Sequence, residues 1–328
     1  MKNALLIGAL LLQYIPAAAQ SANNYTQTNL DSNIPGTGFM DTEMVNTWGL
    51  VFTGGPRAGS LWYVASSGTG YYTAIYGNSG DWGTNFPVPA VNGSGSGSPA
   101  GGCDFNNDIY YGTLDGGIFN TATNKYVVNN AAEGAVYTAC TAWFSARYDE
   151  TLYAANSAGG VEAYDPDFNP VTLAPGAFVD PNIPAGFTPD GIYATYQQIW
   201  VSFFNGTPGS SQGYVDAFDH NGRLLISLQA GEWMNQPFGI AQAPAKFGAF
   251  SNDLLVAMTG SGMIAAFNLQ TGAFHGVLEN ASGQPIVISG IHGIGFGNGA
   301  EAGPTTTLYF AAGPDGFTEG LFGSITAN

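Results

Sequence analysis

The stretch Gly59-Ser60-Leu61-Trp62-Tyr63-Val64-Ala65 decides the fold, because the chain repeats its pattern. In each copy a polar or turn residue precedes Leu or Ile, an aromatic residue usually follows, and an apolar and a small residue end the run. The six copies begin at Leu61, Ile109, Leu152, Ile199, Leu254 and Leu308, at intervals of 48, 43, 47, 55 and 54 residues. This regular spacing indicates a structure built from six similar units.

Each unit contains other short runs that are typical of strands. A glycine-containing run such as residues 292–296 precedes each copy, and a Gly-led run such as residues 213–219 often follows it. Four short antiparallel strands at this period are typical of a propeller blade, whose two faces are buried only when blades stack around an axis. We therefore predict an all-β fold, a six-bladed β-propeller of four-stranded antiparallel blades. Two packed sheets are the alternative, but they do not predict a fixed period.

The two ends of the chain complement each other. The sixth unit ends with a third strand at residues 321–325, and the sequence stops at Asn328 without a fourth. A strand-like run at residues 25–30 precedes the first unit and has no place within it. We expect this N-terminal run to close the last blade as its outer strand, because it would cover an otherwise bare sheet edge.

The N-terminus has the pattern of a secretory signal peptide. Lys2 precedes an apolar run at residues 4–12, and small residues at 17–19 provide a cleavage site. We therefore expect a signal peptide at residues 1–19, a single propeller domain at residues 20–328, and a secreted, extracellular protein. No later stretch reaches membrane-spanning length.

The charge of the chain limits its partners. Only 9% of residues are charged and the formal net charge is −17, so the chain has no basic patch to neutralise phosphates. Nucleic acid is therefore excluded as a partner, and anionic membranes are disfavoured. An unknown small molecule, glycan or protein remains as the expected partner of a monomeric protein.

The cysteines and sequons fit an extracellular setting. Cys103 and Cys140 lie at or beside the start of inner strands in neighbouring blades, so we predict a disulfide between them. Four Asn-x-Ser/Thr sequons, which we expect in surface loops or at strand ends of a glycoprotein, begin at Asn24, Asn92, Asn205 and Asn280.

The candidate site lies where the inner strands begin, because these strands surround the axial channel. Asp190 and His292 are the candidate catalytic pair, a carboxylate and an imidazole that can exchange protons. The expected ligand-binding residues are Asn46, Thr47, Asn235 and Gln236. Asp190, Asn46 and Asn235 offer oxygen ligands for Ca²⁺, although no cofactor is firmly indicated. The structural alternative is that these side chains cap strands or bind loop main chain.

Some segments resemble known propellers. Asn46-Thr47-Trp48-Gly49-Leu50 and Gln236-Pro237-Phe238-Gly239-Ile240-Ala241 resemble the opening of NHL-type repeats. Residues 27–36, 179–187, 213–219 and 308–323 are similar to an uncharacterised family of secreted microbial six-bladed β-propeller proteins. The resemblance covers nearly the whole chain after the signal peptide and implies the fold, but it implies no activity. At Asp190 and His292 this chain departs from the apolar residues of the family pattern.

Three functions are therefore compatible with the sequence. The first is a binding or scaffold protein that uses the channel mouth or a loop face, favoured because the chain has no recognisable catalytic set. The second is a Ca²⁺-dependent hydrolase or lactonase, in which a metal polarises a carbonyl group. The third is a tailoring enzyme that uses Asp190 and His292 as acid and base.

Overall fold

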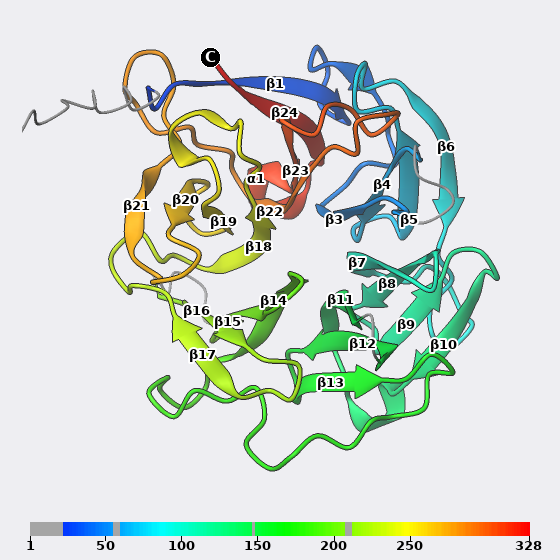
Figure 1. The fold of residues 1–328 in the computed structure, drawn as a ribbon. Coiled ribbons are helices and arrows are strands. Elements are labelled where there is room, and N and C mark those ends of the chain that lie inside the picture. The colour runs from blue at the N-terminus through cyan, green and yellow to red at the C-terminus, as the bar shows by residue number, and fades with distance from the viewer. Residues whose placement is uncertain (1–21, 55–59, 146–147, 207–211) are drawn as a thin grey trace, which may run out of the picture.

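The protein is a six-bladed β-propeller (Figure 1), which confirms the fold expected from the repeat. The computed structural model describes residues 22–54, 60–145, 148–206 and 212–328. The predicted signal peptide at residues 1–19 lies outside the described residues. None of the described helices is long and apolar enough to cross a membrane.

Four of the six sheets have four antiparallel strands each. From the axis outward, blade one contains β3 (Thr47–Val51), β4 (Trp62–Ser66), β5 (Tyr71–Ile75) and β6 (Trp82–Pro87). Blade two contains β7 (Pro99–Phe105), β8 (Asp108–Thr113), β9 (Gly117–Asn120) and β10 (Lys125–Asn129). Blade four contains β14 (Thr188–Ala194), β15 (Ile199–Phe204), β16 (Tyr214–Phe218) and β17 (Leu224–Ser227). Blade five contains β18 (Pro237–Gln242), β19 (Leu254–Met258), β20 (Ile264–Phe267) and β21 (Phe274–Val277).

The other two sheets differ in strand number. Among the described residues, blade three has only β11 (Tyr137–Ser145), β12 (Tyr148–Asn156) and β13 (Gly160–Tyr164). Blade six contains β22 (Ile291–Phe296), β23 (Leu308–Ala312), β24 (Leu321–Ala327) and β1 (Tyr25–Ser32), with β2 (Phe39–Met40) beyond β1. Three single-turn helices complete the described structure: η1 (Ala131–Glu133), η2 (Gly248–Phe250) and α1 (Pro314–Phe317).

The N-terminal strand closes the ring as predicted. β1 pairs antiparallel with β24, with Tyr25 opposite Ala327 and Ser32 opposite Leu321. Figure 1 shows the two strands side by side, although they come from opposite ends of the chain. The closing contact is sealed by Tyr25, which is 1% exposed and whose hydroxyl donates a hydrogen bond to the carbonyl oxygen of Phe247.

The repeated motif forms the second strand of each blade and fills the space between blades. Its aromatic side chains Trp62, Tyr111, Trp200 and Tyr309 are all 2% exposed or less. Trp62 and Tyr309, from blades one and six, pack with their ring centroids 5.4 Å apart. These aromatic residues are therefore packing residues, as the sequence indicates.

The predicted disulfide is present. Cys103 in β7 and Cys140 in β11 are bonded, with their Cα atoms 5.5 Å apart. Both cysteines lie farther along their strands than expected, because β7 begins at Pro99 and β11 at Tyr137. The four sequon asparagines lie outside the strands and none of them is buried.

Candidate functional site

The channel along the propeller axis contains a cavity of about 360 Å³. Each of the six inner strands contributes to its wall, from β3 in blade one to β22 in blade six. The inner strands also contact one another in a closed cycle, so the wall is continuous. None of the residues that line the cavity is Lys, Arg or His. The cavity is therefore suited to neutral or cationic ligands rather than anions.

A ring of small residues surrounds the axis near the start of the inner strands. Each inner strand contains a β-bulge there. A Cβ atom on Gly239 would collide with the carbonyl oxygen of His292, and one on Gly293 with that of Trp48, both in the next blade. Close approach of neighbouring backbones therefore requires small residues at this level. The six ring positions are Gly49, Gly101, Ala139, Gly191, Gly239 and Gly293.

The residue before each ring position is equivalent in all six blades, and two of these six are the candidate catalytic residues. The six are Trp48, Ala100, Thr138, Asp190, Phe238 and His292. Blades five, six and one contribute aromatic rings, whereas blades two, three and four contribute small or polar side chains. The six positions are equivalent because the blades repeat. Their side chains differ, so the set of six has an aromatic half, from blades five, six and one, and a half with small or polar side chains, called the polar half below.

His292 belongs to the aromatic half. It is 3% exposed, and its Nδ1 lies 3.2 Å from the carbonyl oxygen of Thr47, so that nitrogen donates the hydrogen bond. Its ring stacks on Trp48 and meets Phe238 edge-on, at centroid distances of 4.5 and 5.6 Å. Phe317 of α1 packs 5.4 Å from it. Burial lowers the pKa of His292 to about 3, so the imidazole is neutral at physiological pH.

Asp190 belongs to the polar half. Its main-chain carbonyl accepts a hydrogen bond of 2.6 Å from the Thr138 hydroxyl, which joins blades three and four. Its half-buried carboxylate makes no hydrogen bond to the described residues. Burial raises the pKa of this carboxyl group to about 7. No hydrogen bond joins Asp190 to His292 in the described structure, and blade five with Phe238 lies between their blades.

The first pair of predicted ligand-binding residues is occupied by structural contacts. The amide of Asn46 donates to the Ser67 hydroxyl and accepts from the Trp48 indole, at 2.9 and 3.1 Å. The Thr47 hydroxyl is buried and donates to the carbonyl oxygen of Ala312, which joins blade one to blade six. These contacts correspond to the structural alternative, in which the side chains fix strand ends.

Asn235 and Gln236 lie apart from the axial cavity. With Phe317 they line a separate pocket of about 300 Å³ beside α1. Within the described residues, no group of three or more His, Cys, Asp or Glu side chains is placed to hold a metal ion. Of the three residues expected to offer oxygen ligands for Ca²⁺, only Asn235 lines this pocket.

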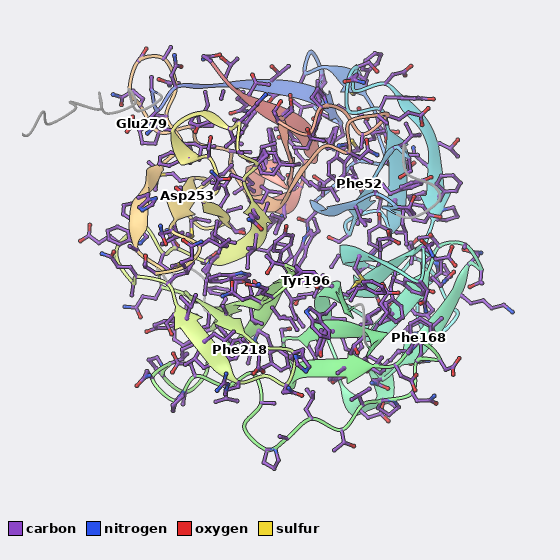
Figure 2. All side chains as sticks on the ribbon, viewed as in Figure 1. Phe52, Phe168, Tyr196, Phe218, Asp253 and Glu279 are labelled. Carbon is purple, nitrogen blue, oxygen red and sulfur yellow. A yellow bond between two sulfur atoms is a disulfide. The ribbon has the colours of Figure 1, made fainter. Side chains whose placement is uncertain are left out.

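Sequence reasoning missed the residues at the opposite mouth, where the inner strands end. Phe52, Asp104 and Phe296 line the cavity at this end. In the loop after β14, Tyr196 is 77% exposed, and Figure 2 shows it at the centre of the ring. Phe144 at the end of β11 is 62% exposed. An aromatic residue at or shortly after the end of an inner strand is the sequence signal that could have located this mouth.

The fold and the cavity define the class of the protein as a six-bladed β-propeller with an axial cavity. No family model matches the chain. The chain is similar to the uncharacterized protein R640 of Acanthamoeba polyphaga mimivirus, with 28% identity over 206 residues, 56% of this chain and 36% of that protein. It is 27% identical to the uncharacterized protein R648 of the same virus over 177 residues, 50% of this chain and 42% of that protein. The chain thus spans less than half the length of these curated relatives.

Solved structures share the architecture. The alignment with a glucose dehydrogenase covers 92% of this chain and 100% of that chain, with a TM-score of 0.56 and 12% sequence identity. The alignment with the WD40 β-propeller domain of Doa1 covers 88% of this chain and 79% of that chain, with a TM-score of 0.50 and 11% sequence identity. At such low identity the similarity shows the fold alone.

Proposed function

We propose that this protein is a binding protein that holds a small, neutral ligand at the mouth of the axial cavity where the inner strands end. The observation that carries the proposal is the axial cavity of about 360 Å³, together with the exposed Tyr196 at the centre of the ring (Figure 2). Ligand sites in proteins are typically concave and largely apolar, with a few polar groups that orient the ligand.

The chemistry of the mouth favours a saccharide. Tyr196 and Phe144 offer exposed rings on which the apolar face of a sugar can stack. Asp104 and Gln242 line the same cavity and offer a carboxylate and an amide to hydroxyl groups. Asp104 already accepts a hydrogen bond from the Gly54 amide through Oδ2, whereas its Oδ1 has no partner among the described residues.

Acid–base catalysis is the second candidate function. It is supported by Asp190, whose pKa of about 7 suits a group that exchanges protons near neutral pH. The neutral His292 would serve in this proposal as its partner or as a hydrogen-bonding group. Both residues directly precede the small-residue ring positions along their inner strands, whereas the aromatic mouth lies at the ends of these strands.

One set of probes tests both candidates. p-Nitrophenyl glycosides of neutral sugars should bind saturably in calorimetry, and Tyr196→Ala should weaken binding by about tenfold, as expected for the loss of one stacking contact. Tyr76→Ala, which removes a tyrosine 40% exposed away from the mouth, is the matched control. Absence of saturable binding, or equal affinity of Tyr196→Ala, would overturn the binding proposal. Release of p-nitrophenolate that disappears in Asp190→Asn would favour the enzymatic candidate instead.

A further inference from the structure

A second site lies at the outer edge of blade three, away from the axis. Blades one, two, four and five each have a fourth strand on their third one, but in the described structure β13 has no such strand. Within the described residues, the main chain of the following segment pairs with β13 only at its end, through a bridge between Tyr164 and Pro170 and a hydrogen bond from the Val171 amide to the Ala163 carbonyl. Beyond Val171, no further main-chain hydrogen bond joins this segment to β13 in the described part of the chain.

The open part of this edge is the beginning of β13. Ala163 directs its carbonyl away from β12, and alternation of the ladder gives Val161 the same orientation. Neither the N–H nor the C=O of Val161 has a hydrogen-bond partner on the side away from β12 among the described residues. An unpaired strand edge is a template for another extended segment.

A cavity of about 770 Å³ adjoins this edge. Val161, Leu173 and Phe168 form part of an apolar wall, and Glu162 and Asn130 are polar lining residues. Figure 2 shows Phe168 beside blades two and three. The volume is within the range of protein ligand sites.

The Glu162 carboxylate is held in a fixed position within this cavity. Its Oε2 accepts hydrogen bonds from the hydroxyls of Tyr137 and Tyr164, at 2.6 and 2.5 Å. Its Oε1 accepts a hydrogen bond of 2.7 Å from the Asn156 amide. The Asn130 amide group donates to both tyrosine hydroxyls, at 2.7 and 3.2 Å. Four side chains therefore orient one carboxylate before any ligand arrives.

The site retains unused acceptors and carries negative charge. Glu162 Oε1 has capacity for a further hydrogen bond, and the Asn130 side-chain oxygen makes none with the described residues. Glu133 also lines the cavity, whereas none of the lining residues is Lys, Arg or His. An ammonium or guanidinium group complements this arrangement in charge and in hydrogen-bond donors.

We propose that the open edge of blade three binds an extended peptide segment that carries a lysine or arginine. The peptide would supply the missing fourth strand by pairing with the main chain of Val161, a known mode of peptide recognition. A residue opposite Glu162 in the added strand would point to the same face as Glu162, because cross-strand neighbours share a face. Its cationic side chain would then reach the oriented carboxylate. This site is independent of the axial cavity.

A matched control exists in blade four. Asp216 occupies in β16 the position that Glu162 occupies in β13, but it lies opposite Ser227 of β17, so the fourth strand is already in place. A variant at Asp216 therefore changes an equivalent carboxylate without changing the open edge.

The test is fluorescence anisotropy with a short labelled peptide of alternating valine and threonine around one central lysine. Wild-type protein should bind it saturably, and replacement of the lysine by norleucine should weaken binding at least tenfold. Glu162→Gln should cause a similar loss, whereas Asp216→Asn should not. A peptide N-methylated on the residues that pair with the edge should also lose binding.

Two further measurements keep the result interpretable. The thermal unfolding of each variant establishes that it is folded, and Glu133→Gln, an exposed position, provides a milder charge change at the same cavity. The proposal is overturned if the lysine peptide does not bind, if Glu162→Gln binds as tightly as wild type while folded, or if N-methylation has no effect.

Discussion

The imidazole of His292 lies nearly flat on the indole of Trp48, with ring centroids 4.5 Å apart and planes inclined by 18°. The two residues come from blades six and one, so the stack spans the junction at which the ring closes. Phe238 and Phe317 enclose the imidazole on other sides. His292 is therefore a packing residue at this junction.

Replacement of His292 tests this structural contribution. His292→Asn removes a buried ring and leaves an amide without a matched partner, so we expect a loss of about 2–4 kcal/mol in the free energy of unfolding. His292→Phe retains a ring and should cost less. Urea unfolding of the two variants measures the difference. Equal stability of His292→Asn and wild type would contradict a packing role.

The same residue predicts a pH dependence. The folded-state pKa of about 3 lies below the ordinary histidine value of about 6.5, so the unfolded chain takes up the proton first as pH falls. Stability should therefore decrease by about 1.4 kcal/mol per pH unit between about pH 6.5 and 3. Subtraction of the His292→Phe profile from the wild-type profile isolates this contribution, and a flat difference would argue against it.

Two buried carboxyl groups predict the opposite dependence. Burial, with Asp41 nearby, raises the pKa of Asp31 to about 8, and burial, with Asp180 nearby, raises that of Asp216 to about 7. Both groups are at most 2% exposed. The folded chain keeps these protons after the unfolded chain has lost them, so stability should fall as pH rises from about 4 to about 8. Asp31→Asn and Asp216→Asn should each flatten the pH profile of the melting temperature in this range, whereas the exposed control Asp167→Asn should not.

Much of the fold could be predicted because it depends on local repetition. The motif beginning at Leu61 recurs once in each blade, where it forms the second strand. The run at residues 25–30, which belongs to no repeat unit, was correctly assigned as the outer strand of blade six. The absent strand of blade three was not predicted. The segment after Asp165 keeps the turn that precedes a fourth strand in other blades, but it pairs with β13 only at Ala163 and Tyr164.

The candidate site was predicted less well because it depends on contacts between blades. Asp190 and His292 occupy equivalent positions near the start of their inner strands. Their environments differ because Trp48, Phe238 and Phe317, which come from other blades and from α1, pack around His292. No pattern in the sequence near His292 or Asp190 reveals these contacts. The acid–base and Ca²⁺ proposals for these residues stay predictions.

The Ca²⁺ proposal can be tested by metal removal. The amide of Asn46 is already occupied by Ser67 and Trp48, so it would have to give up these contacts to bind a cation. We expect that a chelator leaves the melting temperature unchanged. A decrease that is reversed by CaCl₂, and that is absent in Asp190→Asn, would instead support a cation at Asp190.

The disulfide between blades two and three is a second stabilising connection. It closes a loop of 37 residues, and the loop-entropy account predicts a contribution of roughly 3–4 kcal/mol. A double Cys103→Ser, Cys140→Ser variant should therefore unfold at lower urea concentration, with an equal or steeper slope because its unfolded chain is less compact. An unchanged midpoint would contradict a stabilising role of the bond.

Removal of the closing strand should have a larger effect than any of these substitutions. Deletion of residues 20–30 exposes the edge of β24 and removes Tyr25, which stacks at 6.1 Å on Phe250 and contacts Phe247 in blade five. Because β1 joins the first part of the chain to the last, its loss should open the ring rather than fray one blade. We expect a broad, low-temperature unfolding transition and concentration-dependent association through the bare edge. Tyr25→Ala, which keeps the main-chain ladder, should lower the melting temperature but preserve a single cooperative transition. A deletion variant that melts like Tyr25→Ala would show that the blade interfaces alone hold the ring closed.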